Sequence, residues 1–208
     1  MLKKFLTTTC AIAILLSTTT TAFASQFDET QFNSIELEAR NELREIWDNY
    51  PVEDSRVEPY INDPGYTGIG TTGDILIALD SITDHVGIVQ DTYTVIEAHP
   101  KNPNGGVDYR SNDWKSRYSK IKGLYIPKAS STNKKNAVSY AKSQIGEPYN
   151  LFADRWGTSD WYCSKLVWRA WYEQGFDIEG RNLELRGQLV TPGDILDSPY
   201  TSVFYSSY

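Results

Sequence analysis

The chain has 208 residues and is acidic, with 27 aspartate and glutamate residues against 20 lysine and arginine residues and a formal net charge of −7 at pH 7. A protein with this negative charge is not attracted to nucleic acid or to an anionic membrane, both of which are also negatively charged. Functions that depend on a basic patch are therefore excluded, and no nucleic-acid partner is expected.

The first 25 residues have the pattern of a secretory signal peptide. Lys3 and Lys4 form a short positive start, the apolar run AIAILL follows, and the segment AFA supplies the small residues that signal peptidase requires. The apolar run is too short to span a bilayer, so we expect cleavage near Ala24 or Ser25, export, and no membrane anchor. The mature chain, residues 26–208, is long enough for a single domain with a substantial core.

Removal of the signal peptide would leave one cysteine. Cys10 lies within the expected signal peptide, so Cys163 becomes the only thiol. It has no partner for an internal disulfide, and one cysteine with two histidines is too few for a Cys-rich zinc site. In an oxidising compartment such a thiol is either buried or used, and the cysteine count leaves both interpretations open.

The mature chain begins with a helical pattern. Residues 28–50 place apolar side chains at spacings of three and four, which is typical of an amphipathic helix. Pro51 ends this helix, and residues 51–72 are rich in Pro, Gly, Asn and Asp, which predicts a loop. The helix itself indicates no function.

A strand pattern follows the loop. Short β-branched runs separated by turn residues predict three neighbouring strands, at residues 74–80, 85–90 and 92–98. The short connection at residues 90–92 predicts that the second and third form an antiparallel hairpin. Residues 99–113 have the composition of a loop, and the run KIKGLYIPK (residues 120–128) predicts a fourth strand.

Two helices are expected after the fourth strand. Capping residues at 130–133 precede apolar residues at helical spacing, and Gly146 ends that helix. The next helix is expected to begin near Ser159 or Asp160 and to run to Gly175. A helix, a meandering sheet and further helices within one domain indicate an α+β architecture.

The expected position of Cys163 suits a nucleophile. If Ser159 or Asp160 caps its helix, Cys163 lies in the first turn, where unpaired backbone N–H groups and the helix dipole stabilise a thiolate. A nucleophilic thiolate needs a partner that shuttles protons. The two histidines that could serve are His85 and His99.

The hairpin register brings a carboxylate to one of these histidines. With the connection at residues 90–92, His85 and Glu97 fall near each other at the open end of the hairpin. Glu97 could then hold the imidazole in the required tautomer and stabilise it when charged, as in a nucleophile–base–carboxylate triad. A slip of one residue would turn Glu97 to the other face of the sheet.

Other interpretations of these residues stay open. A lone cysteine on an aromatic-rich helix is usually a small buried hydrophobic residue. A histidine that opens a strand is more often a partly exposed residue than a base. A metal site formed by His85, Glu97, His99 and Cys163 is a further alternative.

The motifs around these residues resemble those of the NlpC/P60 cysteine peptidases. GEPYN followed by WYCSKLVWRAWYEQG is similar to that family's G-x-P-Y loop and C-S-x-L-V helix, and GDILIAL and HVGIV resemble its GD strand and histidine strand. In the ordinary family the cysteine helix comes first, whereas here Gly73, Asp74 and His85 precede Cys163. This rotated order is similar to the permuted branch, in particular the YiiX/YebB-like papain-fold hydrolases, over roughly residues 70–205.

The resemblance implies a circularly permuted papain-like α+β fold, with an antiparallel sheet packed against helices, and a hydrolase that needs no metal or cofactor. Cys163 would be the nucleophile, His85 the general base and Glu97 the group that orients the base. The backbone N–H of Cys163 would help to form the oxyanion hole. Tyr149 would line the substrate cleft, and His99 would be a structural or cleft-edge residue.

The residues beside the cysteine differ from those of the bacterial cell-wall peptidases. Those enzymes have Asp directly before the cysteine and Gly two residues after it, where this chain has Tyr162 and Lys165. We therefore expect Tyr162 and Lys165 to be substrate-binding residues. The γ-D-glutamyl specificity of the cell-wall peptidases is not carried over.

The leading hypothesis is a secreted cysteine hydrolase that cleaves an amide or peptide bond, in an extracellular or cell-wall setting, with peptidoglycan-derived peptides as the substrate class. One alternative is a lipid thioesterase or acyltransferase on the same fold, against which the acidic surface argues. Another is a non-catalytic module that binds wall peptide or glycan through its aromatic residues. The sequence does not indicate the oligomeric state.

Overall fold

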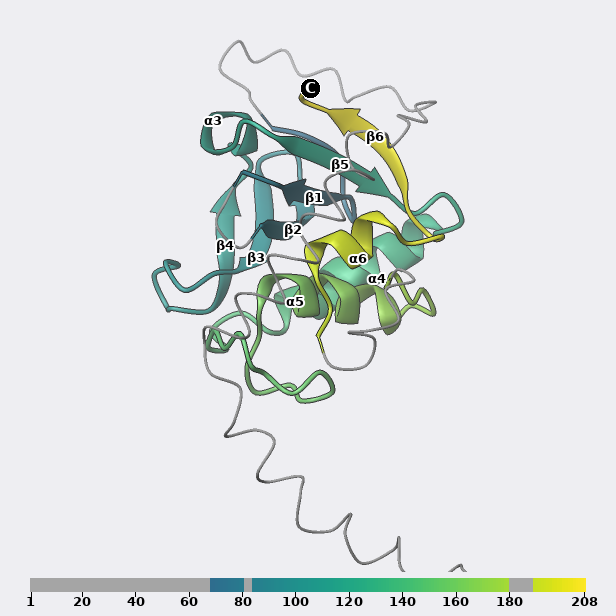
Figure 1. Ribbon diagram of the computed structural model, residues 1–208. Coiled ribbons are helices and arrows are strands. Elements are labelled where there is room, and N and C mark those ends of the chain that lie inside the picture. The colour runs from purple at the N-terminus through teal and green to yellow at the C-terminus, as the bar shows by residue number, and fades with distance from the viewer. Residues whose placement is uncertain (1–67, 81–83, 180–188) are drawn as a thin grey trace, which may run out of the picture. The chain divides into compact units, whose positions relative to one another are not determined.

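The structure is a computed structural model that describes residues 68–80, 84–179 and 189–208 (Figure 1). These residues belong to one unit, Glu45–Tyr208. The expected signal peptide at residues 1–25, the expected helix at residues 28–50 and most of the expected loop at residues 51–72 lie outside the described residues. Within the described residues, no helix is long and apolar enough to cross a membrane.

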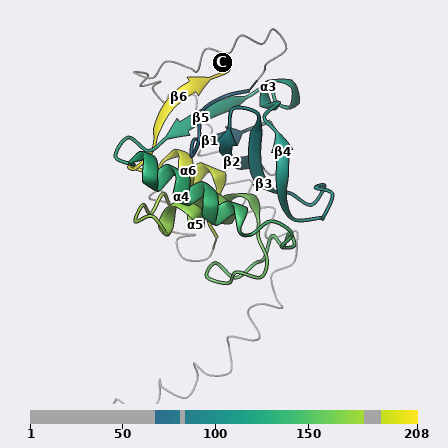
Figure 2. The same ribbon diagram turned by 180° about the vertical axis from the view of Figure 1, so that it is seen from behind.

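In the described part of the chain, six strands form one sheet with the order β4-β3-β2-β1-β5-β6 (Figures 1 and 2). Their bounds are β1 Ile75–Ala78, β2 His85–Asp91, β3 Thr94–Ala98, β4 Val107–Ser111, β5 Ile121–Tyr125 and β6 Ser202–Ser206. All neighbouring strands pair antiparallel. The predicted antiparallel sheet is therefore confirmed.

Four helices are described. Their bounds are α3 Trp114–Arg117, α4 Ser131–Lys142, α5 Cys163–Tyr172 and α6 Pro192–Leu196. Helices α4 and α5 pack against β2 and β3, and Figures 1 and 2 show both helices on one face of the sheet. Helix α4 begins as predicted, because Ser130 and Asn133 form a reciprocal capping box.

The sheet separates two hydrophobic cores. Ile75 and Ile77 of β1 face the larger core, which also contains the apolar face of α5, whereas Leu76 and Ala78 face a smaller core that contains Trp114. Each residue of β1 is buried, since both faces of this strand are covered. The continuous apolar run of β1 follows from this double burial.

The hairpin of β2 and β3 positions the residues of the site. Ile88 pairs with Ile96, so Gly87 lies opposite Glu97 and His85 lies diagonal to Glu97 on the same face. The connection lies at residues 92–93, slightly later than predicted. The predicted pairing of the two strands and the shared face are confirmed.

The prediction of a loop over residues 99–113 is confirmed for residues 99–105 and is wrong for residues 107–111. Strand β4, Val107–Ser111, pairs with β3 along its whole length, and α3 follows at Trp114. Strand β4 is an edge strand and only Val107 in it is buried, so its sequence carries little hydrophobic signal.

Helix α6 and strand β6 were not predicted either. Helix α6 is a single turn, which is too short for a periodic pattern of apolar residues.

Close backbone contact at Gly106 joins the start of β4 to the segment before the cysteine helix. A Cβ atom at Gly106 would lie 1.9 Å from the carbonyl oxygen of Glu147. Gly106→Ala is therefore expected to lower the free energy of unfolding by about 2–3 kcal/mol, because one backbone must move. Urea denaturation measures this change. Gly157→Ala is the matched control, since its Cβ would meet atoms only at 3.4 Å and beyond; equal stability of both variants would contradict the expectation.

Candidate active site

Cys163 is the first residue of α5 and is almost completely buried, with 7% of its surface exposed. The predicted caps, Ser159 and Asp160, are wrong, because the helix begins after Tyr162, whose side chain makes no capping hydrogen bond. Asp160 instead accepts a hydrogen bond from the Asn150 side chain at 2.6 Å. The first-turn N–H groups of α5 therefore have no side-chain cap, and they favour negative charge at the position of Cys163.

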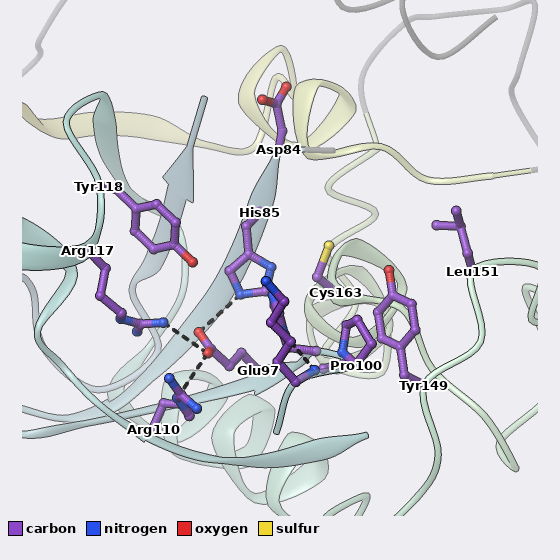
Figure 3. A pocket seen from close by; sticks show the side chains of 13 residues that line it. Asp84, His85, Glu97, Pro100, Arg110, Arg117, Tyr118, Tyr149, Leu151 and Cys163 are labelled. Atoms are coloured by element: carbon purple, nitrogen blue, oxygen red, sulfur yellow. Dashed lines mark hydrogen bonds and ion pairs between the residues drawn. The ribbon is translucent and has the colours of Figure 1, made fainter. Parts of the chain in front are cut away.

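His85 lies between the thiol and a carboxylate (Figure 3). Its Nε2 is 3.1 Å from Oε2 of Glu97, and the other ring nitrogen, Nδ1, faces Cys163. Burial lowers the pKa of His85, but hydrogen bonds to Cys163 and Glu97 and the charge of Glu97 outweigh it and raise the pKa to about 9. An imidazolium at His85 is therefore stable at neutral pH.

Glu97 is a buried carboxylate held by three basic groups. Besides His85, Nη1 of Arg117 lies 3.1 Å and Nε of Arg110 lies 3.6 Å from its Oε1. Burial alone would raise the pKa of Glu97, but the hydrogen bond and charge of His85 and the charge of Arg117 lower it to about 2. Glu97 is thus ionised throughout the physiological range and fixed in orientation.

Helix α3 supports this arrangement from the side of the smaller core. Trp114 stacks on the ring of His85, with 5.7 Å between the ring centroids and 17° between the planes. The guanidinium of Arg117 lies over Trp114 and Tyr118, at 5.6 and 5.3 Å from their ring centroids. Sequence reasoning missed Arg110, Arg117 and Trp114, because all lie in or next to the segment predicted as a loop. The dense aromatic and basic run WKSRY was the only available signal.

The groups meet in a cavity of about 580 Å³. Its lining includes Cys163, His85, Glu97 and Tyr149. His99 lines the cavity as well, and its ring meets the ring of His85 edge-on at 5.1 Å. Burial and the charge of His85 lower the pKa of His99, which favours a neutral His99 beside the charged ring of His85.

The structure places Tyr162 and Lys165 away from this cavity. Both side chains are buried, at 1% and 0% exposure, and neither contributes to the cavity lining. The Tyr162 hydroxyl accepts a hydrogen bond from the Val190 N–H, and Lys165 donates to the carbonyl of Asp160 at 2.7 Å. Both residues therefore support the loop before α5 and the segment at Val190, and the positions expected to bind substrate have structural contacts instead.

The described residues contain no cluster of three or more His, Cys, Asp or Glu side chains arranged to hold a metal ion. The proposed alternative of His85, Glu97, His99 and Cys163 does not form such a cluster. The hydrogen bonds explain this, because one nitrogen of His85 meets Glu97 and the other faces Cys163, while Nδ1 of His99 accepts from the Lys101 N–H at 2.9 Å.

The ionised pair of His85 and Glu97 links stability to pH. His85 has its pKa raised from 6.5 to about 9, so its contribution is complete below pH 6.5 and is lost as the pH rises through about 9. Glu97 has its pKa lowered from 4.5 to about 2, so its contribution is complete above pH 4.5 and is lost as the pH falls through about 2. We expect the free energy of unfolding to fall by roughly 2–3 kcal/mol between pH 6.5 and pH 9.5. Urea denaturation of the protein and of His85→Gln tests this, and an equal fall in both would contradict it.

Comparison with known sequences identifies a family. Residues 65–196 match the family described as "Permuted papain-like amidase enzyme, YaeF/YiiX, C92 family". The chain is also 29% identical over 129 residues to the uncharacterized protein YycO of Bacillus subtilis, covering 60% of this chain and 49% of that protein. The chain thus spans about half the length of this curated relative.

Comparison with solved structures supports the fold. The crystal structure of a protein described as the metalloprotein yiiX, from Escherichia coli O157:H7, superposes with a TM-score of 0.52 at 19% sequence identity. The match covers 65% of this chain and 97% of the E. coli chain. The permuted papain-like fold predicted from motif order is therefore confirmed.

Proposed function

Since this chain belongs to the permuted papain-like amidase family (YaeF/YiiX, C92), we propose that it is a cysteine amidase that acts through Cys163, His85 and Glu97. The observation that carries the proposal is the continuous contact from thiol to imidazole to carboxylate within one cavity. A nucleophile, a base within hydrogen-bond reach and a group that orients the base are the requirements of this chemistry.

The proposed reaction begins when the thiolate sulfur of Cys163 attacks the carbonyl carbon of an amide. The carbonyl π electrons move to oxygen, and the N–H of Cys163 at the start of α5 donates to this oxyanion. The imidazolium of His85 gives its proton to the leaving amine as the C–N bond breaks, which leaves a thioester. His85 then accepts a proton from water, the resulting hydroxide attacks the thioester, and the thiolate and a carboxylic acid are released.

Glu97 holds the base for both half-reactions. As a carboxylate it accepts a hydrogen bond from the Nε2–H group of His85, so Nδ1 is the nitrogen that exchanges a proton with the thiol, the amine and water. Arg117 and Arg110 contact Oε1 of the carboxylate, whereas His85 contacts Oε2, so both oxygens of Glu97 are held. The catalytic role of Glu97 is thus orientation and charge, and it does not take up a proton, since its pKa is about 2.

We propose peptides of the cell-wall type as the substrate class and the outside of the cell as the location. The signal-like N-terminal sequence and membership of an amidase family support this assignment. The cavity lining combines the apolar side chains of Pro100 and Leu151 and the ring of Tyr149 with the polar groups. An amide flanked by small side chains fits such a lining.

A comparison of substrate classes tests the proposed function. The purified chain and Cys163→Ala are incubated with peptidoglycan fragments and, separately, with detergent-dispersed phospholipid. We expect new amino groups from the fragments with the wild-type chain only, detected by amine labelling and mass spectrometry. Release of fatty acid without amide cleavage would contradict the proposal and would favour a lipid hydrolase. Retention of fragments without cleavage would favour a binding module.

A further inference from the structure

We propose that the cavity beside Cys163 binds a carboxylate of the substrate close to the scissile amide, and that Lys101 is the residue that selects it. The inference rests on the proposed function, because it names a feature of the substrate of the same site. It extends that function from amides in general to amides that carry a negative charge.

The charge of the cavity is opposite to the charge of the chain. The whole chain has a net charge of −7, yet the cavity lining holds Lys101, Arg110 and Arg117 against Asp84 and Glu97. In the proposed mechanism the negative charge of the Cys163 thiolate cancels the positive charge of the His85 imidazolium. The lining therefore keeps one positive charge in excess. A cavity with one positive charge in excess, within an acidic protein, concentrates anions where the protein surface repels them.

Lys101 is the cation of the cavity that remains available. Arg117 and Arg110 both point at the carboxylate of Glu97, as the dashed contacts in Figure 3 show. Lys101 is exposed and forms no ion pair with a carboxylate of the described residues. Figure 3 also shows Asp84 beyond the start of β2, at the end of the cavity away from Arg110 and Arg117. An ammonium group without a carboxylate partner attracts an anionic ligand more strongly than a paired guanidinium does.

Backbone contacts hold Lys101 near the reacting groups. Its N–H donates to Nδ1 of His99, and the His99 ring lies edge-on to the base His85 at 5.1 Å. Burial and the charge of His85 lower the pKa of His99, which favours a neutral His99 that adds no cation to this wall of the cavity. Lys101 and His85 line the same cavity, so a substrate carboxylate that pairs with the ammonium group of Lys101 is held in the cavity where the amide is cleaved.

The rate of alkylation of Cys163 reports the positive charge of the cavity, and the measurement does not require amide hydrolysis. Iodoacetate carries a carboxylate and iodoacetamide is its neutral analogue, so the ratio of their rates reports the local preference for an anion. The rates are measured by mass spectrometry of the peptide that contains Cys163. We expect Lys101→Glu to lower the iodoacetate-to-iodoacetamide ratio about fivefold, and we expect added salt to shrink this difference. Lys101→Arg should keep the ratio of the wild-type chain.

Lys128→Glu is the matched control, because Lys128 is exposed and lies outside the cavity lining. It makes the same change in net charge. A ratio that Lys101→Glu leaves unchanged, or that Lys128→Glu lowers equally, would overturn the proposal. Neither result depends on amide hydrolysis, so failure of this inference is distinguishable from failure of the proposed function.

Matched amides complete the test. Kinetics with an N-succinyl amide and its N-acetyl analogue should show a higher kcat/KM for the succinyl amide, and Lys101→Glu should abolish that preference. Phosphatidylglycerol is the second arm, because a lipid phosphate carries the same charge. Ester hydrolysis of phosphatidylglycerol that depends on Lys101, without a preference for the succinyl amide, would overturn the assignment of a carboxylate.

Discussion

Replacement of Cys163 by alanine is expected to lower kcat for amide hydrolysis by at least about 10⁴-fold, because it removes the atom that forms the acyl-enzyme. The residue is small and buried at the start of α5, so the free energy of unfolding should change by no more than about 1 kcal/mol. Steady-state kinetics and urea denaturation of the same preparations give the two values.

Cys163→Ser is the control for this prediction. It keeps a hydroxyl at the same position and tests whether sulfur is needed, since a serine hydroxyl beside an imidazolium is a far weaker nucleophile than a thiolate. We expect Cys163→Ser to be nearly as inactive as Cys163→Ala. Activity within tenfold of the wild-type chain in Cys163→Ala would rule out the thiol as the nucleophile.

Glu97→Gln is expected to lower kcat/KM by about 10²–10³-fold and to move its alkaline limb to lower pH. The carboxylate stabilises the imidazolium of His85, whose pKa is about 9. An amide at this position lowers the pKa of His85 and leaves Arg117 and Arg110 close to an imidazolium without a compensating charge. The imidazolium is therefore lost at a lower pH, and a profile of kcat/KM against pH measures the shift.

Asp108→Asn is the matched control for Glu97→Gln, because it also replaces a carboxylate by an amide, on the neighbouring strand β4. Asp108 of β4 pairs with Glu97 of β3 in the sheet register, but it does not line the cavity. Its profile should keep the alkaline limb of the wild-type chain. An unchanged alkaline limb in Glu97→Gln would show that Glu97 does not act through His85, even if the variant is less active.

The part of the site on the hairpin could be predicted from sequence because its geometry is local. A short connection determines the register of β2 and β3, and the period of two then places His85 and Glu97 on one face. Cys163 is far away in sequence, and its contact with His85 follows from the packing of α5 against β2. The permuted order of the motifs was the only sequence signal for this contact.

The groups that hold Glu97 could not be predicted in the same way. Arg110 comes from edge strand β4, whose formation depends on pairing with β3, and Arg117 comes from the four-residue helix α3. Neither element is long or apolar enough to leave a periodic pattern. Their contacts with Glu97 join segments that only the folded sheet brings together.

The residues beside Cys163 show a different limit of sequence-based prediction. Comparison with cell-wall peptidases predicted that Tyr162 and Lys165 bind substrate, but the helix begins at Cys163 itself. That start turns both side chains into the protein, where Lys165 reaches the carbonyl of Asp160 and lies 4.6 Å from the ring centroid of Trp161. A shift of the helix start by one or two residues changes which side chains face the cavity, and such boundaries are weakly encoded in sequence.

Trapping of the acyl-enzyme shows directly whether the thiol of Cys163 is acylated during amide cleavage. The chain is mixed with a peptide amide that it cleaves, the reaction is quenched with acid within one turnover, and the mass of the protein is measured. We predict an increase equal to the acyl part of the substrate, located on Cys163 by peptide mapping and absent from Cys163→Ala. Amide cleavage by the wild-type chain with no adduct on Cys163, or with an adduct on another residue, would contradict the account.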